Sequence, residues 1–204
     1  MRPPVRLAAM MQIPSVFVFS HDSVAVGEDG PTHEPIEHLI GLRSIPMLNV
    51  IRPADGNESL AAVQIAFESK STPTAIITSR QNVNNLKGTS LEGVKLGGYI
   101  VDKEENKLDG ILLASGSEVS LAVEVKKILK EKGLDIRVVS MPSHYSFLNQ
   151  SKEYQESILP TNVKTLAIEM GSSYSWHRFT RNVYGIDTFG ISANQNKVFE
   201  LFGF

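Results

Sequence analysis

Two histidines and two carboxylates lie in or beside one short glycine-bearing segment. Residues 27–33 read Gly-Glu-Asp-Gly-Pro-Thr-His, and His21 precedes them, directly after the apolar run Val16–Ser20. An imidazole exchanges protons near neutral pH, and a carboxylate accepts hydrogen bonds from hydroxyl groups. The apolar run predicts a strand, and a helical pattern starts at Pro35. Loops between a strand and a helix carry ligand-binding and catalytic residues in α/β folds.

A second polar cluster follows another predicted strand, Thr74–Ser79, which is succeeded by Arg80. In a parallel sheet, the carboxyl ends of the strands meet at one edge, where ligands bind. Arg80 and His21 are therefore expected to converge there as a phosphate clamp, because a guanidinium and an imidazolium suit a phosphate dianion. The alternative is that Arg80 only pairs with a carboxylate on the surface.

His33, Glu34 and His38 resemble a metal-binding motif only superficially. A zinc protease needs His-Glu-x-x-His, in which both imidazoles share one helical face. A spacing of five would place the two rings about 140° apart on a helix, and Pro35 lies between them. We expect no metal site here and interpret His38 as a helix-surface or packing residue.

Other possible reactive groups have simpler interpretations. Residues 114–118 read Ala-Ser-Gly-Ser-Glu at a strand–helix junction, without the spacing of a dinucleotide-binding or P-loop motif. A tight turn is favoured, with an anion site on its N–H groups as the alternative. His144 and His177 are interpreted as surface or packing residues. Ser143 and Ser175 lack a nucleophile elbow around them.

The composition narrows the class of protein. The chain has 204 residues, 42% of them hydrophobic, a formal net charge of −2 and no cysteine. This is ordinary for a globular protein and offers no basic field for nucleic acid or an anionic membrane. The lack of cysteine excludes disulfides and a thiol nucleophile, and it fits a reducing compartment such as the cytoplasm.

Apolar runs alternate with helical patterns along most of the chain. The further predicted strands are Met47–Ile51, Gly97–Val101, Gly110–Ser115, Ile136–Ser140 and Thr165–Glu169. The predicted helices are Pro35–Arg43, Ser59–Ser69, Glu118–Lys132 and Asn194–Phe202. Asp55 and Glu58 have capping-box spacing, and Gly133 marks a helix end. Nearly continuous apolarity in the strands favours parallel sheets covered on both faces.

Two regions depart from this alternation. Residues Gln81–Lys95 are rich in Asn, Lys, Gly and Ser and are interpreted as a linker. The apolar stretch Leu7–Phe19 follows two arginines, as in a signal peptide, but Gln12 and Pro14 interrupt it. A helix followed by a buried strand is the favoured reading. We predict an α/β fold of two three-layer units with mainly parallel sheets, joined near residue 96.

Long motifs in both halves resemble the transketolase family. The matching segments are residues 21–23 (His-Asp-Ser), 27–35 (Gly-Glu-Asp-Gly-Pro-Thr-His-Glu-Pro), 52–55 (Arg-Pro-Ala-Asp), 73–75 (Pro-Thr-Ala), 79–82 (Ser-Arg-Gln-Asn), 98–99 (Gly-Tyr), 114–119 (Ala-Ser-Gly-Ser-Glu-Val), 138–142 (Val-Val-Ser-Met-Pro) and 188–190 (Thr-Phe-Gly). They occur in the family's order and cover nearly the whole chain. The versions at residues 27–33 and 79–82 favour transketolase over other thiamine-diphosphate enzymes.

The resemblance implies domains, chemistry and residue roles. Residues 1–96 correspond to the C-terminal part of the pyrimidine-binding domain with a linker, so the first unit is incomplete, and residues 97–204 to the C-terminal domain. The family transfers a two-carbon ketol unit from a ketose phosphate to an aldose phosphate. His21 and Arg80 match residues that hold the substrate phosphate, and Asp29 matches one that reads a substrate hydroxyl. His33 matches a catalytic histidine that also contacts the substrate.

The resemblance also implies partners that this chain does not hold by itself. Thiamine diphosphate and Mg²⁺ are expected to bind through residues upstream of Met1, the cofactor-activating glutamate included. The family works as a cytoplasmic homodimer on sugar phosphates in the pentose phosphate pathway, with neither nucleic acid nor membrane as partner. We expect the isolated chain to be inactive, with an uncovered sheet edge. The alternatives are a non-catalytic subunit that pairs with a separate cofactor-binding chain, and a dihydroxyacetone synthase-type relative.

Overall fold

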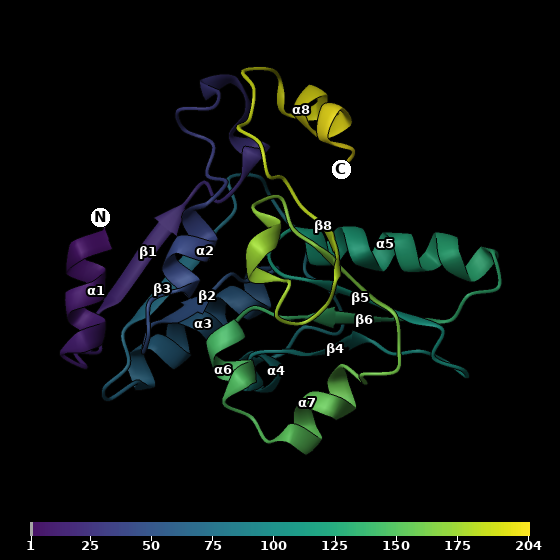
Figure 1. The fold of residues 1–204 in the computed structure, drawn as a ribbon, viewed down its shortest axis with the longest axis horizontal. Coiled ribbons are helices and arrows are strands. Elements are labelled where there is room, and N and C mark those ends of the chain that lie inside the picture. Colours follow the sequence, from purple (N-terminus) through teal and green to yellow (C-terminus); the bar gives the residue numbers. More distant parts are fainter. Residues whose placement is uncertain (1) are drawn as a thin grey trace.

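A three-stranded parallel sheet organises the first part of the chain. The computed structural model describes residues 2–204 (Figure 1). The strands are β1 (Val16–Ser20), β2 (Asn49–Ile51) and β3 (Thr74–Thr78), in the order β1–β3–β2. Ser20 lies opposite Thr78 in register. The chain therefore leaves β1 and β3 side by side at the same edge of the sheet.

Helices cover both faces of this first sheet. On one face, α1 (Arg2–Met10) and α2 (His38–Arg43) bury Val5 and Leu39 against strand residues such as Val50. On the other face, α3 (Gly56–Glu68) and α4 (Leu91–Leu96) pack Ala61 and Val94 against Ile76. The three-layer arrangement predicted from the continuous apolar strands is confirmed.

A five-stranded sheet organises the second part of the chain. Its strands are β4 (Tyr99–Asp102), β5 (Gly110–Ala114), β6 (Ile136–Ser140), β7 (Thr165–Ile168) and β8 (Asn182–Tyr184). The order is β4–β6–β5–β7–β8, and β4 is antiparallel to β6 whereas the other pairs are parallel. The prediction of mainly parallel sheets is therefore confirmed.

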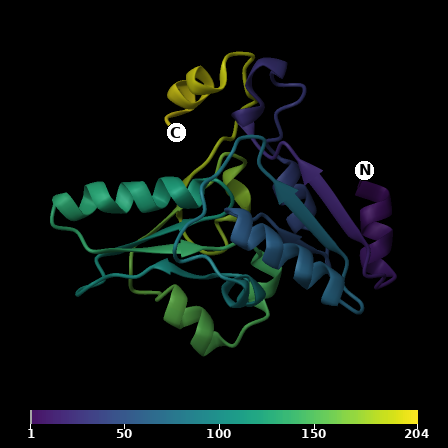
Figure 2. The same cartoon turned by 180° about the vertical axis from the view of Figure 1, so that it is seen from behind.

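The helices of the second part again form two outer layers. The long α5 (Glu118–Glu131) covers one face, at the opposite end of the molecule from α1 in both views (Figures 1 and 2). On the other face, α6 (His144–Leu148) and α7 (Lys152–Ile158) surround a core that includes Trp176. A short turn, η2, spans Ser173–Ser175.

The final helix leaves the second sheet and returns to the first part of the chain. Helix α8 (Gln195–Phe202) packs on η1 (Val24–Asp29), a short helical segment after β1, and the two lie together in both views (Figures 1 and 2). Val24 and Val198 share a buried apolar cluster with Met170. Residues near the two ends of the chain thus form one packed region.

Local signals in the sequence explain several element ends. The Asp55 carboxylate caps α3 by accepting a hydrogen bond from Glu58 N at 2.9 Å. The Glu58 carboxylate accepts from Ala54 N at 2.7 Å instead of completing a capping box at Asp55. Gly133 has φ +80° just after α5, as a helix-ending glycine requires.

The interpretation of Gln81–Lys95 as a linker is wrong for its last five residues, whereas residues 81–90 contain neither helix nor strand. This stretch contains most of α4, which begins at Leu91 and is capped by the Ser90 hydroxyl, the acceptor for Gly93 N at 3.1 Å. Before it, Leu86 N donates to the capping carboxylate of α3 at 2.8 Å. Two polar side chains of the stretch also contact the start of α3: Asn85 accepts from Gly56 N at 3.0 Å, and Thr89 donates to Asp55 at 2.7 Å.

The prediction that β1 is buried is also wrong. Val18 is 65% exposed, whereas Phe17 and Phe19 are half-buried against the cluster beneath α1. Within residues 2–204, β1 pairs only with β3, so one edge of the sheet is uncovered, as expected. Among these residues, no helix combines the length and apolarity that crossing a bilayer requires.

Candidate active site

Two of the predicted site residues leave the first sheet at the same edge. His21 follows the last residue of β1, and Arg80 lies two residues beyond β3. Both side chains are exposed. The backbone of His21 has φ +66°, a left-handed conformation that residues other than glycine seldom adopt. The structure therefore bears out the expected placement of His21 and Arg80 at one edge.

The loop between β1 and α2 carries the other two predicted site residues, Asp29 and His33. Asp29 ends η1, and Gly30 follows with φ +73°. His33 lies in the succeeding turn, with its Nδ1 atom 2.9 Å from the hydroxyl of Thr32. Asp29 and His33 are both exposed, so their polar groups can reach a ligand.

A hollow of about 600 Å³ is lined by some of the four predicted site residues. Its lining includes His21 and His33, together with His38, but neither Asp29 nor Arg80. The Arg80 guanidinium instead donates to the side chain of Gln195 at 3.5 Å. The structure thus brings two of the four predicted residues into one hollow and leaves the other two outside it.

The position of His38 differs from the one assumed when His33 and His38 were considered as metal ligands. Helix α2 begins at His38 and not at Pro35, so His33 and His38 are not on one helix, and both line the same hollow. The His38 side chain is exposed and lies 3.7 Å from Glu37, which agrees with a helix-surface residue. Within residues 2–204, no group of three or more histidine, aspartate and glutamate side chains could hold a metal ion.

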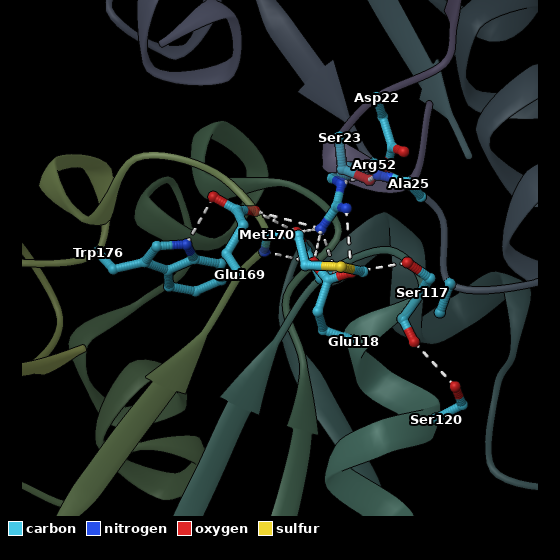
Figure 3. A network of polar contacts seen from close by, with 12 residues as sticks. Asp22, Ser23, Ala25, Arg52, Ser117, Glu118, Ser120, Glu169, Met170 and Trp176 are labelled. Carbon is cyan, nitrogen blue, oxygen red and sulfur yellow. Dashed lines mark hydrogen bonds and ion pairs between the residues drawn. The ribbon is translucent and has the colours of Figure 1, made fainter. Parts of the chain in front are cut away.

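A buried ionic cluster starts at Asp22, the residue that follows His21 in the sequence (Figure 3). Arg52, just after β2, is completely buried, and its Nε donates to the Asp22 carboxylate at 2.7 Å. Its terminal nitrogens donate to both oxygens of Glu118, at the start of α5, and to the carbonyl oxygen of Ser115 at 2.7 Å. Burial opposes the charge of Arg52, but the neighbouring carboxylates outweigh it and raise its pKa.

A second arginine extends this cluster into the core of the second sheet. Glu169, directly after β7, accepts hydrogen bonds from Arg43 at 2.7 and 2.9 Å and from the Trp176 indole at 2.7 Å. Burial alone would raise the pKa of Glu169, but the charges of Arg43 and Arg52 lower it to about 2. The carboxylate is therefore ionised at neutral pH, as a paired buried charge.

Sequence reasoning missed this cluster because its members are far apart along the chain. One signal was available: Arg52 and Glu169 are charged residues placed directly after apolar strands. The junction at residues 114–118 is a tight turn, as favoured, in which Gly116 has φ +61° and donates to the carbonyl oxygen of Arg52 at 3.1 Å. The Gly116 N–H is used by this contact, and the Glu118 carboxylate already pairs with Arg52, which disfavours a further anion at this turn.

The remaining histidines agree with packing and surface roles. His144 is buried, with its ring edge-on to Trp176 and Phe179 at centroid distances of 4.6 and 4.8 Å. His177 is exposed. The Ser143 hydroxyl donates to the side chain of Asn49 at 2.6 Å, which is a structural contact between the two parts of the chain.

Comparisons with known proteins agree with this geometry. Residues 1–85 match the transketolase pyrimidine-binding domain, and residues 97–204 match the transketolase-like C-terminal domain. Transketolases of Staphylococcus epidermidis and Bacillus subtilis are 53% and 50% identical over 100% of this chain. The chain covers 32% of each of them, so it spans about a third of their length.

Solved structures show the same fold at lower identity. A Pichia stipitis transketolase in complex with sedoheptulose 7-phosphate is 43% identical, with a TM-score of 0.94 over 98% of this chain and 29% of its own. A Leishmania mexicana transketolase is 42% identical, with the same TM-score and the same coverage. Family models cover both parts of the sequence, and the fold and the site-bearing loop agree with them. The chain belongs to the transketolase family.

Proposed function

We propose that this chain forms part of a thiamine-diphosphate-dependent transketolase, which transfers a two-carbon ketol unit from a ketose phosphate to an aldose phosphate. One observation carries the proposal: in a member of this family, His21 and His33 line one hollow, at the sheet edge that also bears Arg80. Residues 1–96 would supply part of the pyrimidine-binding domain and residues 97–204 the C-terminal domain. The enzyme would be a cytoplasmic homodimer of the pentose phosphate pathway, with neither nucleic acid nor membrane as partner.

His21 and Arg80 are assigned to the substrate phosphate. Both side chains are exposed at the same edge of the sheet, and within residues 2–204 the Arg80 guanidinium makes a single long hydrogen bond, to Gln195 at 3.5 Å, which a ligand could replace. A guanidinium binds a phosphate dianion through two parallel hydrogen bonds, and a protonated imidazole adds a third donor. The Pichia relative solved with sedoheptulose 7-phosphate supports a phosphorylated sugar as the ligand.

Asp29 and His33 are assigned to the reacting end of the sugar. A carboxylate such as Asp29 accepts a hydrogen bond from a substrate hydroxyl and so selects its configuration. His33 lines the hollow with its imidazole exposed, and it would contact the substrate and exchange a proton with it during transfer. His33 is therefore the catalytic residue of this chain in the proposal.

Thiamine diphosphate would supply the electron sink for the carbanion that the transfer requires. Among residues 2–204, no group of three or more histidine, aspartate and glutamate side chains could hold a metal ion, so this part of the chain offers no preformed site for Mg²⁺. Both are proposed to bind through other parts of the assembled enzyme.

A chimera tests the proposal. Residues 1–204 would replace the matching segment of the Staphylococcus epidermidis transketolase, which is 53% identical to them. With thiamine diphosphate, Mg²⁺, a ketose phosphate and an aldose phosphate, the chimera should transfer the ketol unit at a rate within about tenfold of the parent enzyme. His33→Ala in the chimera should lower kcat by about 10²–10⁴-fold, because a proton-transfer group is lost.

The control variant is His177→Ala, which removes an exposed imidazole from the second part of the chain. It should retain the activity of the unmodified chimera. A chimera that is folded and dimeric yet transfers no ketol unit would contradict the proposal. Full activity of His33→Ala would contradict the role assigned to that residue.

A further inference from the structure

We propose that the second part of the chain positions His21 through the contact path Glu118–Arg52–Asp22, and that Arg52 and Glu118 are positioning residues for the substrate phosphate. The inference rests on the phosphate role of His21 in the proposed function. The C-terminal unit would thus influence substrate binding although Glu118, its residue in this path, does not line the hollow.

The path begins at the residue next to His21. Asp22 is buried, whereas His21 is exposed and has the unfavourable φ of +66°. Such a conformation persists only where the surroundings hold it. One oxygen of the Asp22 carboxylate accepts from Arg52 Nε at 2.7 Å, and the other has no partner among residues 2–204. Arg52 is thus the group that fixes the Asp22 side chain, and with it the backbone that presents His21.

Arg52 in turn has little freedom to move. Its guanidinium is completely buried and contacts both oxygens of Glu118 (Figure 3). The turn at Gly116 lies so close that an added Cβ would be 2.5 Å from Arg52 Cζ. The planar fork of arginine is therefore held in one orientation, with Nε directed at Asp22.

Glu118 anchors this fork to the second sheet. It is the first residue of α5, and its carboxylate also accepts from Met170 N at 3.1 Å and from the Ser117 hydroxyl at 2.6 Å. Met170 lies just beyond β7. The second sheet is thus connected to His21 by hydrogen bonds and ion pairs through the buried side chains of Glu118, Arg52 and Asp22.

The test uses the chimera and two substitutions that preserve size. Glu118→Gln removes the charge that orients Arg52, and Asp22→Asn weakens the last contact while leaving Arg52 and Glu118 paired. Each should raise the KM for a phosphorylated aldose by about tenfold, because small displacements of a binding group cost large factors. Neither should change the KM for an unphosphorylated aldehyde acceptor. The second variant keeps the test informative if Glu118→Gln does not fold.

A double-mutant comparison separates positioning from a general loss of structure. In a His21→Ala background, Glu118→Gln should raise the KM for the phosphorylated acceptor no further, because its effect passes through His21. The matched control is Glu58→Gln, another fully buried carboxylate, which joins the same two parts through Tyr99 at 2.6 Å and Ser140 at 2.7 Å. It should lower thermal stability without altering either KM.

Three results would overturn the inference. The first is a loss of stability in Glu118→Gln and Asp22→Asn with both KM values unchanged. The second is an equal rise in KM from Glu118→Gln with and without His21. The third is an unchanged KM for the phosphorylated acceptor in His21→Ala itself. That result would also contradict the phosphate role of His21. The proposed transketolase activity would still stand if the chimera transferred the ketol unit.

Discussion

The hydroxyl of Ser192 donates a hydrogen bond to the carbonyl oxygen of Glu28 across 2.6 Å. Glu28 immediately precedes Asp29, so this contact fastens the site-bearing loop to a segment 164 residues later in the chain. The same segment leads into α8, which packs on η1 within this loop. The conformation of the loop is therefore a property of the whole chain, and this relationship motivates the first prediction.

Gly30→Ala should destabilise the 204-residue chain and disturb the loop. Gly30 has φ +73° and ψ −166°, a region that is almost exclusive to glycine, and an added Cβ would lie 3.0 Å from the Cβ of Ser192. The strain should lower the free energy of unfolding by about 1–3 kcal/mol. Urea unfolding followed by circular dichroism measures this loss.

Gly133→Ala is the control, since Gly133 also has positive φ but nothing within 4 Å of an added Cβ. This substitution should lower the free energy of unfolding by about 1 kcal/mol. Equal losses would show that contact with Ser192 adds nothing.

Arg52→Met should be among the most destabilising single substitutions in this chain. Methionine retains apolar volume but leaves the buried carboxylates of Asp22 and Glu118 without their partner. Breaking a buried ion pair from one side costs about 3–5 kcal/mol. Unfolding by urea at pH 7 measures the change in free energy.

Lys130→Ala supplies the comparison for Arg52→Met. Lys130 pairs with Glu105, and both side chains are more than half exposed. Solvent screens such a pair, so the unfolding midpoint should barely move. If the two substitutions had similar small effects, the buried cluster would not contribute to stability as its geometry indicates.

The stability of the chain should fall as the pH decreases from 7 to 5, partly because of His144. Burial, together with the nearby charges of Arg43 and Arg178, lowers the pKa of His144 well below its usual value, although Glu169 opposes this. In that pH range the unfolded state therefore binds a proton that the folded state excludes. Each such proton reduces the free energy of unfolding by up to about 1.4 kcal/mol per pH unit.

His144→Phe tests this prediction while keeping an aromatic ring beside Trp176 and Phe179. Because phenylalanine cannot bind a proton, the variant should lose less stability than the parent between pH 7 and pH 5. The measurement is the urea midpoint at several pH values across this range. Parallel curves for the two proteins would mean that His144 does not contribute to the pH dependence.

Arg80→Ala in the chimera should weaken the binding of phosphorylated substrates but not that of unphosphorylated ones. Loss of a charge-assisted hydrogen bond costs about 1.5–3 kcal/mol, so the KM for sugar phosphates should rise about tenfold or more. The KM for an unphosphorylated acceptor should stay the same, because Arg80 contacts only the phosphate in the proposal. Steady-state kinetics with a matched pair of acceptors decides between these outcomes, and an equal loss on both would contradict the phosphate clamp.

Local patterns in the sequence were sufficient to predict most of the sheet structure. The strands Val16–Ser20 and Ile136–Ser140 have the predicted bounds, and the end of α5 shortly before Gly133 follows from a glycine that tolerates positive φ. These features depend on neighbours within a few residues, so they can be predicted directly from the sequence. The loop of residues 27–33 was recognisable for the same reason, since its histidine and carboxylates lie within seven residues of sequence.

Short elements escaped sequence analysis because packing stabilises them. Helix α4 was interpreted as part of a linker, and helices α6 and α7 have only 5 and 7 residues. Isolated helices of this length are marginal in water, so their stability comes from tertiary contacts that a local pattern does not contain. The exposure of β1 is likewise decided by its place at the edge of the sheet, although its residues resemble those of a buried strand.

The sequence by itself determined the types of the main elements, the chemistry of the loop and the kinship of the chain. Only the tertiary structure decided that Arg52 joins Asp22 to Glu118, which lie 30 and 66 positions away along the chain. The physical reason is that a buried charge is tolerable only beside an opposite charge. Which charges meet depends on the three-dimensional arrangement of two sheets, and no local spacing encodes that arrangement.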